Sequence, residues 1–113
     1  MIEKTVLDYL NRKLEQPVWL QVPEGEDLPA SYVLIEKTGS SRANRISAAT
    51  IAIQSYASRM IDAAELNEAV KAVMDDIVML DVIGSSKLNS DYNFTDTETK
   101  KYRYQAVYDI THY

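Results

Sequence analysis

The sequence predicts an α+β domain in which two helices pack on one face of a mostly antiparallel sheet, in the order α-β-β-β-α-β-β. Two segments place apolar residues at helical spacing, and five others are rich in Val, Ile and Tyr or alternate apolar with polar residues. Each amphipathic helix needs an apolar sheet face to cover, so both are expected on the same side. The length of 113 residues suits one domain, predicted to span residues 1–113.

The first predicted element is a helix over residues 1–14. Pro17 prevents its continuation, because helices usually end before the residue that precedes a proline. Its apolar stripe consists of Ile2, Val6, Leu7, Leu10 and Leu14. A short strand over 18–22 follows, and the Pro- and Gly-containing segment 23–30 is predicted to be a solvated connector.

A hairpin is predicted next. Residues 32–38 favour a strand that Gly39 ends, residues 39–45 read as an exposed polar loop, and residues 46–57 favour the returning strand. Adjacent strands with a short connection usually pair antiparallel.

The second helix is predicted from five apolar residues spaced 4, 3, 4 and 3 apart: Leu66, Val70, Val73, Ile77 and Leu80. Asp62 and Glu65 have the spacing of a capping box at its start. Gly84 is a plausible end signal.

The last third predicts another hairpin. Leu88, Tyr92 and Phe94 are expected on one face of its first strand, and the loop spans residues 95–100. The terminal segment alternates strictly, which predicts a strand with one apolar face made by Tyr102, Tyr104, Ala106, Tyr108 and Ile110.

Composition excludes several classes of function. The formal net charge is −5, so firm binding of duplex nucleic acid is not expected, because Lys and Arg supply most of that affinity. The absence of cysteine excludes disulfides, thiol catalysis and cysteine-based metal sites. No apolar run is long enough for a membrane span, and the charged first helix does not resemble a signal peptide.

Residues able to support catalysis are scarce. The one histidine, His112, lies beside the end of the chain, where a catalytic triad is hard to hold. Asp75 and Asp76 are neighbours on a helix and do not face each other. The acids Asp91, Asp96 and Glu98 lack the glycine-centred spacing of calcium loops, so turn chemistry is the favoured interpretation. No cofactor, metal or catalytic residue is predicted.

Two features are more typical of an assembly surface. The segment from Gly39 to Arg45 lacks the pattern of a phosphate-binding loop, and its arginines favour an exposed tip or a contact with a neighbouring subunit. The chain also has eight tyrosines, three of them on one side of the last strand. Tyrosine suits interfaces, although packing of these rings under the helices is an equal alternative.

A family resemblance rests on the order of these segments. It runs from Pro29 through YVLIEKTG at 32–39, AIQSYA at 52–57 and Ala63-Ala64 to Ile77, and includes Tyr102-Arg103-Tyr104 in the terminal strand. This pattern resembles the tail-terminator, or tail-completion, proteins of long-tailed phages and prophages, which belong to the minor tail and head–tail joining proteins.

The resemblance implies a structural, non-enzymatic protein that forms a hexameric ring on the head-proximal end of the tail tube. Its partners would be further copies of itself, the major tail-tube protein and the head–tail connector proteins, with DNA passing through without specific binding and no membrane contact. Such a protein resides in the host cytoplasm during assembly and then in the virion. The candidate subunit or tube contacts are Gly39, Ser40, Ser41, Arg42, Arg45, Asp96, Glu98, Lys100, Tyr102 and Tyr104.

Three alternatives stay open at this point. The chain could be another component of the head–tail connector, or a small regulatory or ligand-binding α+β domain outside phages. It could also be an enzyme that uses carboxylates such as Asp91 and Asp96.

Overall fold

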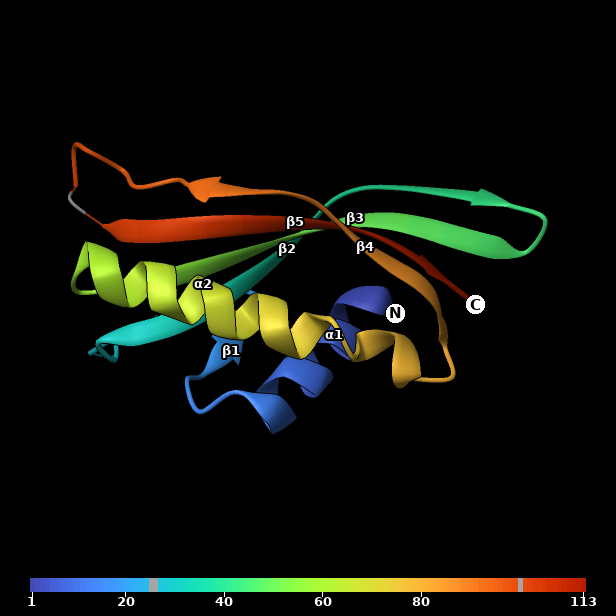
Figure 1. Ribbon diagram of the computed structural model, residues 1–113, viewed down its shortest axis with the longest axis horizontal. Coiled ribbons are helices and arrows are strands. Elements are labelled where there is room, and N and C mark those ends of the chain that lie inside the picture. Colours follow the sequence, from blue (N-terminus) through green and yellow to red (C-terminus); the bar gives the residue numbers. More distant parts are fainter. Residues whose placement is uncertain (25–26, 100) are drawn as a thin grey trace.

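Two helices cover one face of a five-stranded sheet in the computed structural model, which describes residues 1–24, 27–99 and 101–113 (Figure 1). The elements are α1 (Ile2–Lys13), β1 (Val18–Trp19), β2 (Ser31–Ala43), β3 (Ile46–Ala57), α2 (Met60–Met74), the short 3₁₀ helix η1 (Ile77–Met79), β4 (Ile83–Asn93) and β5 (Tyr102–His112). This arrangement confirms the predicted α+β class and the order α-β-β-β-α-β-β. No helix among the described residues is long and apolar enough to cross a membrane.

The sheet has the strand order β1-β2-β3-β5-β4. All neighbours pair antiparallel except β1, which runs parallel to β2 through only two residue pairs. The strands β3 and β5 lie inside the sheet, with a hydrogen-bonded neighbour on each side. The predicted strand at 18–22 is therefore too long, because the chain leaves β2 after Trp19 and exposes Leu20.

The core lies between the helices and the inward face of the sheet. Val6 and Leu10 of α1 and Val70 of α2 are fully buried against Val33, Ile51, Ile53 and Ile110 of the sheet. Both predicted stripes therefore contact the sheet. Tyr9 joins the two helices, because its hydroxyl donates a hydrogen bond of 2.7 Å to the backbone oxygen of Val73.

The second helix differs from the prediction at both ends. It ends at Met74, and after a turn the chain forms η1, which keeps Ile77 buried without a continuous α-helix. The predicted capping box does not form. Arg59 is the N-cap, and the Asp62 carboxylate accepts two hydrogen bonds from the Arg59 guanidinium, at 2.8 and 3.0 Å. Gly84 lies inside β4, so it does not end a helix.

Candidate assembly surface

The hairpin arm, residues 39–47, is the most exposed part of the sheet. The predicted polar loop at 39–45 is wrong, because β2 continues to Ala43 and β3 begins at Ile46. Gly39, expected to end the strand, instead follows a register shift after Lys37 and pairs with Thr50. Pairing between β2 and β3 is unbroken from Gly39↔Thr50 to Ala43↔Ile46, and the arm extends along the right side of Figure 1. Its β3 strand also pairs with β5 up to Ser47↔His112, so only residues 43–46, the tip of the arm, reach beyond the other strands.

A two-residue turn closes the arm. Asn44 and Arg45 have φ angles of 52° and 65°, the positive values that match a tight hairpin turn to the twist of its strands. Gly39, Ser40, Ser41 and Arg42 lie along β2, whereas Arg45 lies in the turn. All five are exposed, so the structure places them together on one projecting element.

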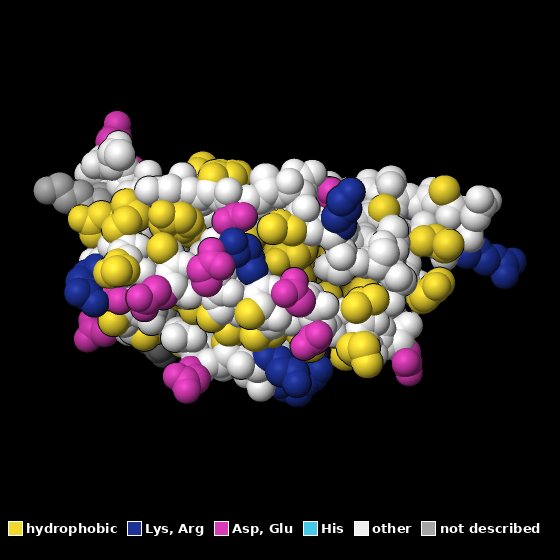
Figure 2. Space-filling model, in the orientation of Figure 1, with side chains coloured by type: hydrophobic (Ala, Val, Ile, Leu, Met, Phe, Trp, Pro, Cys, Tyr) yellow, Lys and Arg dark blue, Asp and Glu magenta, His cyan; other side chains and the backbone are white. Residues whose placement is uncertain are grey.

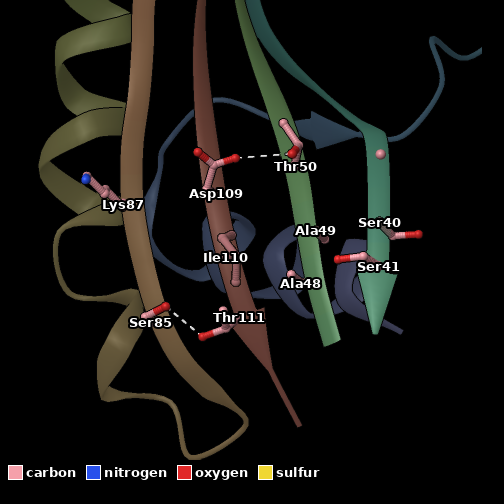
Figure 3. A pocket seen from close by; sticks show the side chains of 11 residues that line it. Ser40, Ser41, Ala48, Ala49, Thr50, Ser85, Lys87, Asp109, Ile110 and Thr111 are labelled. Atoms are coloured by element: carbon pink, nitrogen blue, oxygen red, sulfur yellow. Dashed lines mark hydrogen bonds between the residues drawn. The ribbon is translucent and has the colours of Figure 1, made fainter. Parts of the chain in front are cut away.

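A groove of about 490 Å³ lies at the base of the arm and is bordered by four strands (Figure 3). Four of its polar side chains form two hydrogen-bonded pairs, Thr50 with Asp109 and Ser85 with Thr111. Asp109 accepts hydrogen bonds from the Thr50 hydroxyl at 3.2 Å and the Asn89 amide at 3.0 Å. The Ser85 and Thr111 hydroxyls hydrogen-bond at 2.6 Å. These contacts tie β3, β4 and β5 together across the groove.

The other candidate residues lie at the opposite end of the molecule, in and beside the β4–β5 loop (Figure 1). The Asp96 carboxylate accepts hydrogen bonds from the Thr99 hydroxyl at 2.8 Å and from the backbone amide of Glu98 at 3.0 Å. The Thr99 hydrogen bond, followed by the Glu98 amide, lowers the pKa of Asp96 below its usual value. Asp96 therefore shapes the turn, Glu98 is exposed, and Lys100 falls outside the described residues.

The two candidate tyrosines of β5 are half-buried. Tyr102 pairs with Ala57, and Tyr104 pairs with Ser55 and with Asn93. Further along the strand Ala106, Tyr108 and Ile110 are buried in the core, as the alternation predicted for them. Burial raises the pKa of Tyr108 to about 12, with a smaller contribution from the charge of Asp75. Tyr108 is thus a core residue, unlike the half-buried Tyr102 and Tyr104.

A row of aromatic side chains on the helix-free face was missed by the sequence reasoning. Trp19, Tyr32 and Tyr56 contact one another across three strands, with ring centroids 5.5 and 4.8 Å apart. Arg103 continues the row: its guanidinium lies 4.3 Å from the centroid of the Phe94 ring and donates a hydrogen bond of 2.9 Å to the Tyr56 hydroxyl. The only sequence signal was their alternation with the core residues of each strand.

A chain of hydrogen bonds runs beside this row. Gln54 donates to Gln105 at 2.8 Å, and Gln105 donates to the Tyr92 hydroxyl at 2.6 Å. The Tyr56 hydroxyl donates to Gln54 at 3.0 Å. Because these groups satisfy one another, the network fixes the register of β3, β4 and β5 on a face that no helix covers.

The sheet has two edges without a hydrogen-bonded neighbour among the described residues. On one side, β1 pairs only with Val33 and Leu34, which leaves β2 from Ile35 onward unpaired on its outer side. On the other side β4 pairs only with β5. Unpaired strand edges can accept a strand of another chain. Register shifts at Ile83/Ser85 and Leu88/Ser90 interrupt the β4 edge.

The acids weighed for catalysis are not brought together. Asp91 accepts hydrogen bonds from Asn67 and Lys71, both at 3.2 Å, whereas Asp96 is held by its own turn. Within residues 1–24, 27–99 and 101–113, no three His, Asp or Glu side chains are grouped closely enough to hold a metal ion. No family model matches the chain, and no curated protein is similar enough to it to indicate a relative.

Proposed function

We propose that this protein is a phage or prophage tail terminator, a structural subunit without catalytic activity. Copies of it would form a ring, hexameric as the resemblance implies, on the head-proximal end of the tail tube. The ring would end polymerisation of the tail-tube protein and present a surface to the head–tail connector. The protein would act in the host cytoplasm during assembly and remain in the virion.

The observation that carries this proposal is the pair of unpaired edges on opposite sides of one sheet. The outer side of β2 and the outer side of β4 are different surfaces, so contact between them on successive copies is heterologous. Heterologous contacts close into rings when the rotation between copies allows it. Both helices lie on one face, which leaves the sheet edges free for such contacts (Figure 1).

The ends of the molecule support two further contacts. The hairpin arm lies at one end and the loop with Asp96 and Glu98 at the other, as Figure 1 shows. Contacts from opposite ends suit a subunit that must meet the tail tube on one side and the connector on the other.

Passage of DNA without specific binding fits the charge pattern of the helix-free face. Lys87 lies across from Asp109 in the strand pairing, and Arg103 is engaged by Tyr56 and Phe94. The stacked rings of Tyr32 and Tyr56 are buried, so they offer no exposed platform for bases. With a net charge of −5 per copy, a ring would repel the DNA backbone.

The test uses purified protein and polymerising tail-tube protein. We expect rings, visible by negative-stain electron microscopy, at one end of each tube, and we expect tube growth to stop when the protein is added. Rings that bind the head connector and ignore tube ends would favour the alternative of another neck component. A monomer that leaves tube growth unchanged would refute the proposal, and a small ligand bound by that monomer would favour the ligand-binding alternative.

A further inference from the structure

The segment that joins α2 to β4 exposes apolar and acidic side chains side by side. Val78, Met79 and Val82 keep 47%, 80% and 47% of their surface exposed. Asp75, Asp76 and Asp81 are exposed beside them, and none takes part in an ion pair within the described part of the chain. We call these six residues the η1 patch. Figure 2 shows hydrophobic side chains at the surface in this region, at the lower right.

A hollow of about 490 Å³ borders the η1 patch. Tyr9, Asp76, Met79 and Leu80 line it, and Arg12 and Lys13 of α1 lie at its other side. The hollow is the size of a few side chains, so it offers space for an inserted apolar residue next to a carboxylate.

The hairpin arm has the complementary chemistry. Residues 39–47 contain Arg42 and Arg45 and no acidic residue, and Ile46 at the tip is 44% exposed. In Figure 2 a basic side chain projects from the right-hand end of the molecule, where the arm lies. An exposed isoleucine that follows two nearby arginines in the chain matches an apolar surface with three aspartates.

The arm cannot fold back onto the η1 patch of its own chain without losing its strand pairing. Its ladder is continuous to the turn, and β3 pairs with β5 from Ser47 onward, which fixes the direction of the arm. Held in this way, the tip of the arm, residues 43–46, reaches beyond β5 and can cover a surface only on another molecule.

We propose that the hairpin arm of one copy docks on the η1 patch of a second copy, with Ile46 against Val78 and Met79 and the arginines beside the aspartates. This inference rests on the proposed self-assembly and adds a second contact between copies to the one between the β2 and β4 edges. Exposed ion pairs contribute little affinity, so the apolar contact holds the arm and the charges orient it.

Disulfide capture tests the contact, because the natural chain has no cysteine. One preparation carries Arg45→Cys and the other Met79→Cys, and they are mixed under mild oxidation with tail tubes present. We expect a covalent dimer of the two variants as the main product. The matched control pairs Arg45→Cys with Thr97→Cys, an exposed position at the far end of the molecule. Equal yields from both pairs would overturn the proposal.

Charge reversal gives an independent test. Arg42→Asp with Arg45→Asp, or Asp76→Arg with Asp81→Arg, is expected to weaken self-association at least about tenfold, and the combined variant is expected to regain most of it. Thermal melts near that of the parent establish that each variant folds. If the parent assembles and all three variants assemble equally well, the docking proposal fails while the proposed function stands. If the parent never assembles, even with tail tubes, the proposed function itself fails.

Discussion

Tyr9 is a buried residue of α1 whose hydroxyl donates to the backbone oxygen of Val73, near the end of α2. Replacing Tyr9 with Phe keeps the ring and removes this link between the helices. We expect the free energy of unfolding to fall by about 1 kcal/mol, the usual net value of such a hydrogen bond. Urea denaturation measures the change.

Tyr104→Phe is the matched control for that experiment. Tyr104 is half-buried, and its hydroxyl takes part in no hydrogen bond among the described residues. We expect the free energy of unfolding of the Tyr104→Phe variant to stay within about 0.5 kcal/mol of the parent, as for most substitutions that break no specific contact. Equal losses in both variants would show that the Tyr9 hydroxyl does not stabilise the helix pair.

Tyr108 makes stability depend on pH in the alkaline range. Burial first, and the charge of Asp75 second, raise its pKa from the ordinary value of 10.0 to about 12. The folded state therefore holds the phenol proton more tightly than the unfolded state does. This stabilisation is complete below pH 10 and is lost as the pH rises toward about 12.

The corresponding experiment compares the parent with Tyr108→Phe. Two pKa units correspond to at most about 3 kcal/mol of stability, so between pH 10 and 12 the parent is expected to lose more stability than the variant. The two proteins share every other ionisable group, so the difference between their profiles isolates Tyr108. Parallel pH profiles would contradict the assignment.

The candidate residues themselves were only partly predictable. The sequence indicated that Arg42, Arg45 and Glu98 would be exposed, because charged residues in polar segments usually are. Turn chemistry was also the favoured interpretation for Asp96, and its hydrogen bonds from the Glu98 amide and the Thr99 hydroxyl confirm it. The same interpretation is wrong for Asp91, which accepts hydrogen bonds from Asn67 and Lys71 of α2. The row from Trp19 to Arg103 joins residues far apart in the chain, so only the fold brings them together.

At the level of elements, both helices followed from the periodicity of apolar residues, and the pairings of β2 with β3 and of β4 with β5 followed from their short connections. The pairing of β3 with β5 was not predicted, because those strands are far apart in the chain. The strand pairing within the hairpin arm was not predicted either. Its Gly and Ser residues have low strand propensity, and the sequence therefore predicted a loop. The ladder continues because β2 and β3 are already in register at Ile35↔Ile53, so each further pair adds backbone hydrogen bonds at little extra entropic cost.

The end of α2 shows a similar limit of prediction from the sequence. The apolar spacing of 4, 3, 4 and 3 correctly predicted that Ile77 is buried, but it also predicted a continuous helix. The turn and η1 keep Ile77 on the same side of the chain as Val70. Periodicity thus indicates which side chains face the core more reliably than where the hydrogen bonding of a helix changes.

The turn of the arm provides a prediction at this scale. Arg45 has a positive φ of 65°, which costs a residue with a side chain roughly 1 kcal/mol and costs glycine almost nothing. Arg45→Gly creates the favoured Asn-Gly turn, so we expect amide hydrogen exchange in residues 39–47 to slow several-fold. Arg45→Val is the control in the opposite direction. A β-branched residue strongly disfavours a positive φ, so amide exchange in residues 39–47 is expected to be faster than in the parent. Exchange that is the same in all three proteins would mean that the turn does not limit opening of the arm.

The whole molecule is elongated, with extents of 44 × 25 × 22 Å. Much of this length comes from the arm at one end and the β4–β5 loop at the other, on either side of one core (Figure 1). Because the residues of the arm are exposed, they contribute little to folding of the single chain. An element that stabilises its own domain so little is a natural place for contacts with other molecules.

Removing the arm tests this separation of roles. Ser40 pairs with Ala49, so replacing residues 41–48 with Asn-Gly closes the hairpin on an existing pair. We expect the shortened protein to keep its circular dichroism spectrum and to melt within a few degrees of the parent, because the buried cluster around Val33, Ile51 and Ile53 is untouched. Ring formation on tail tubes is expected to be lost. A shortened protein that folds and still caps tubes would show that the arm is not needed for assembly and that the contacts at the sheet edges are sufficient.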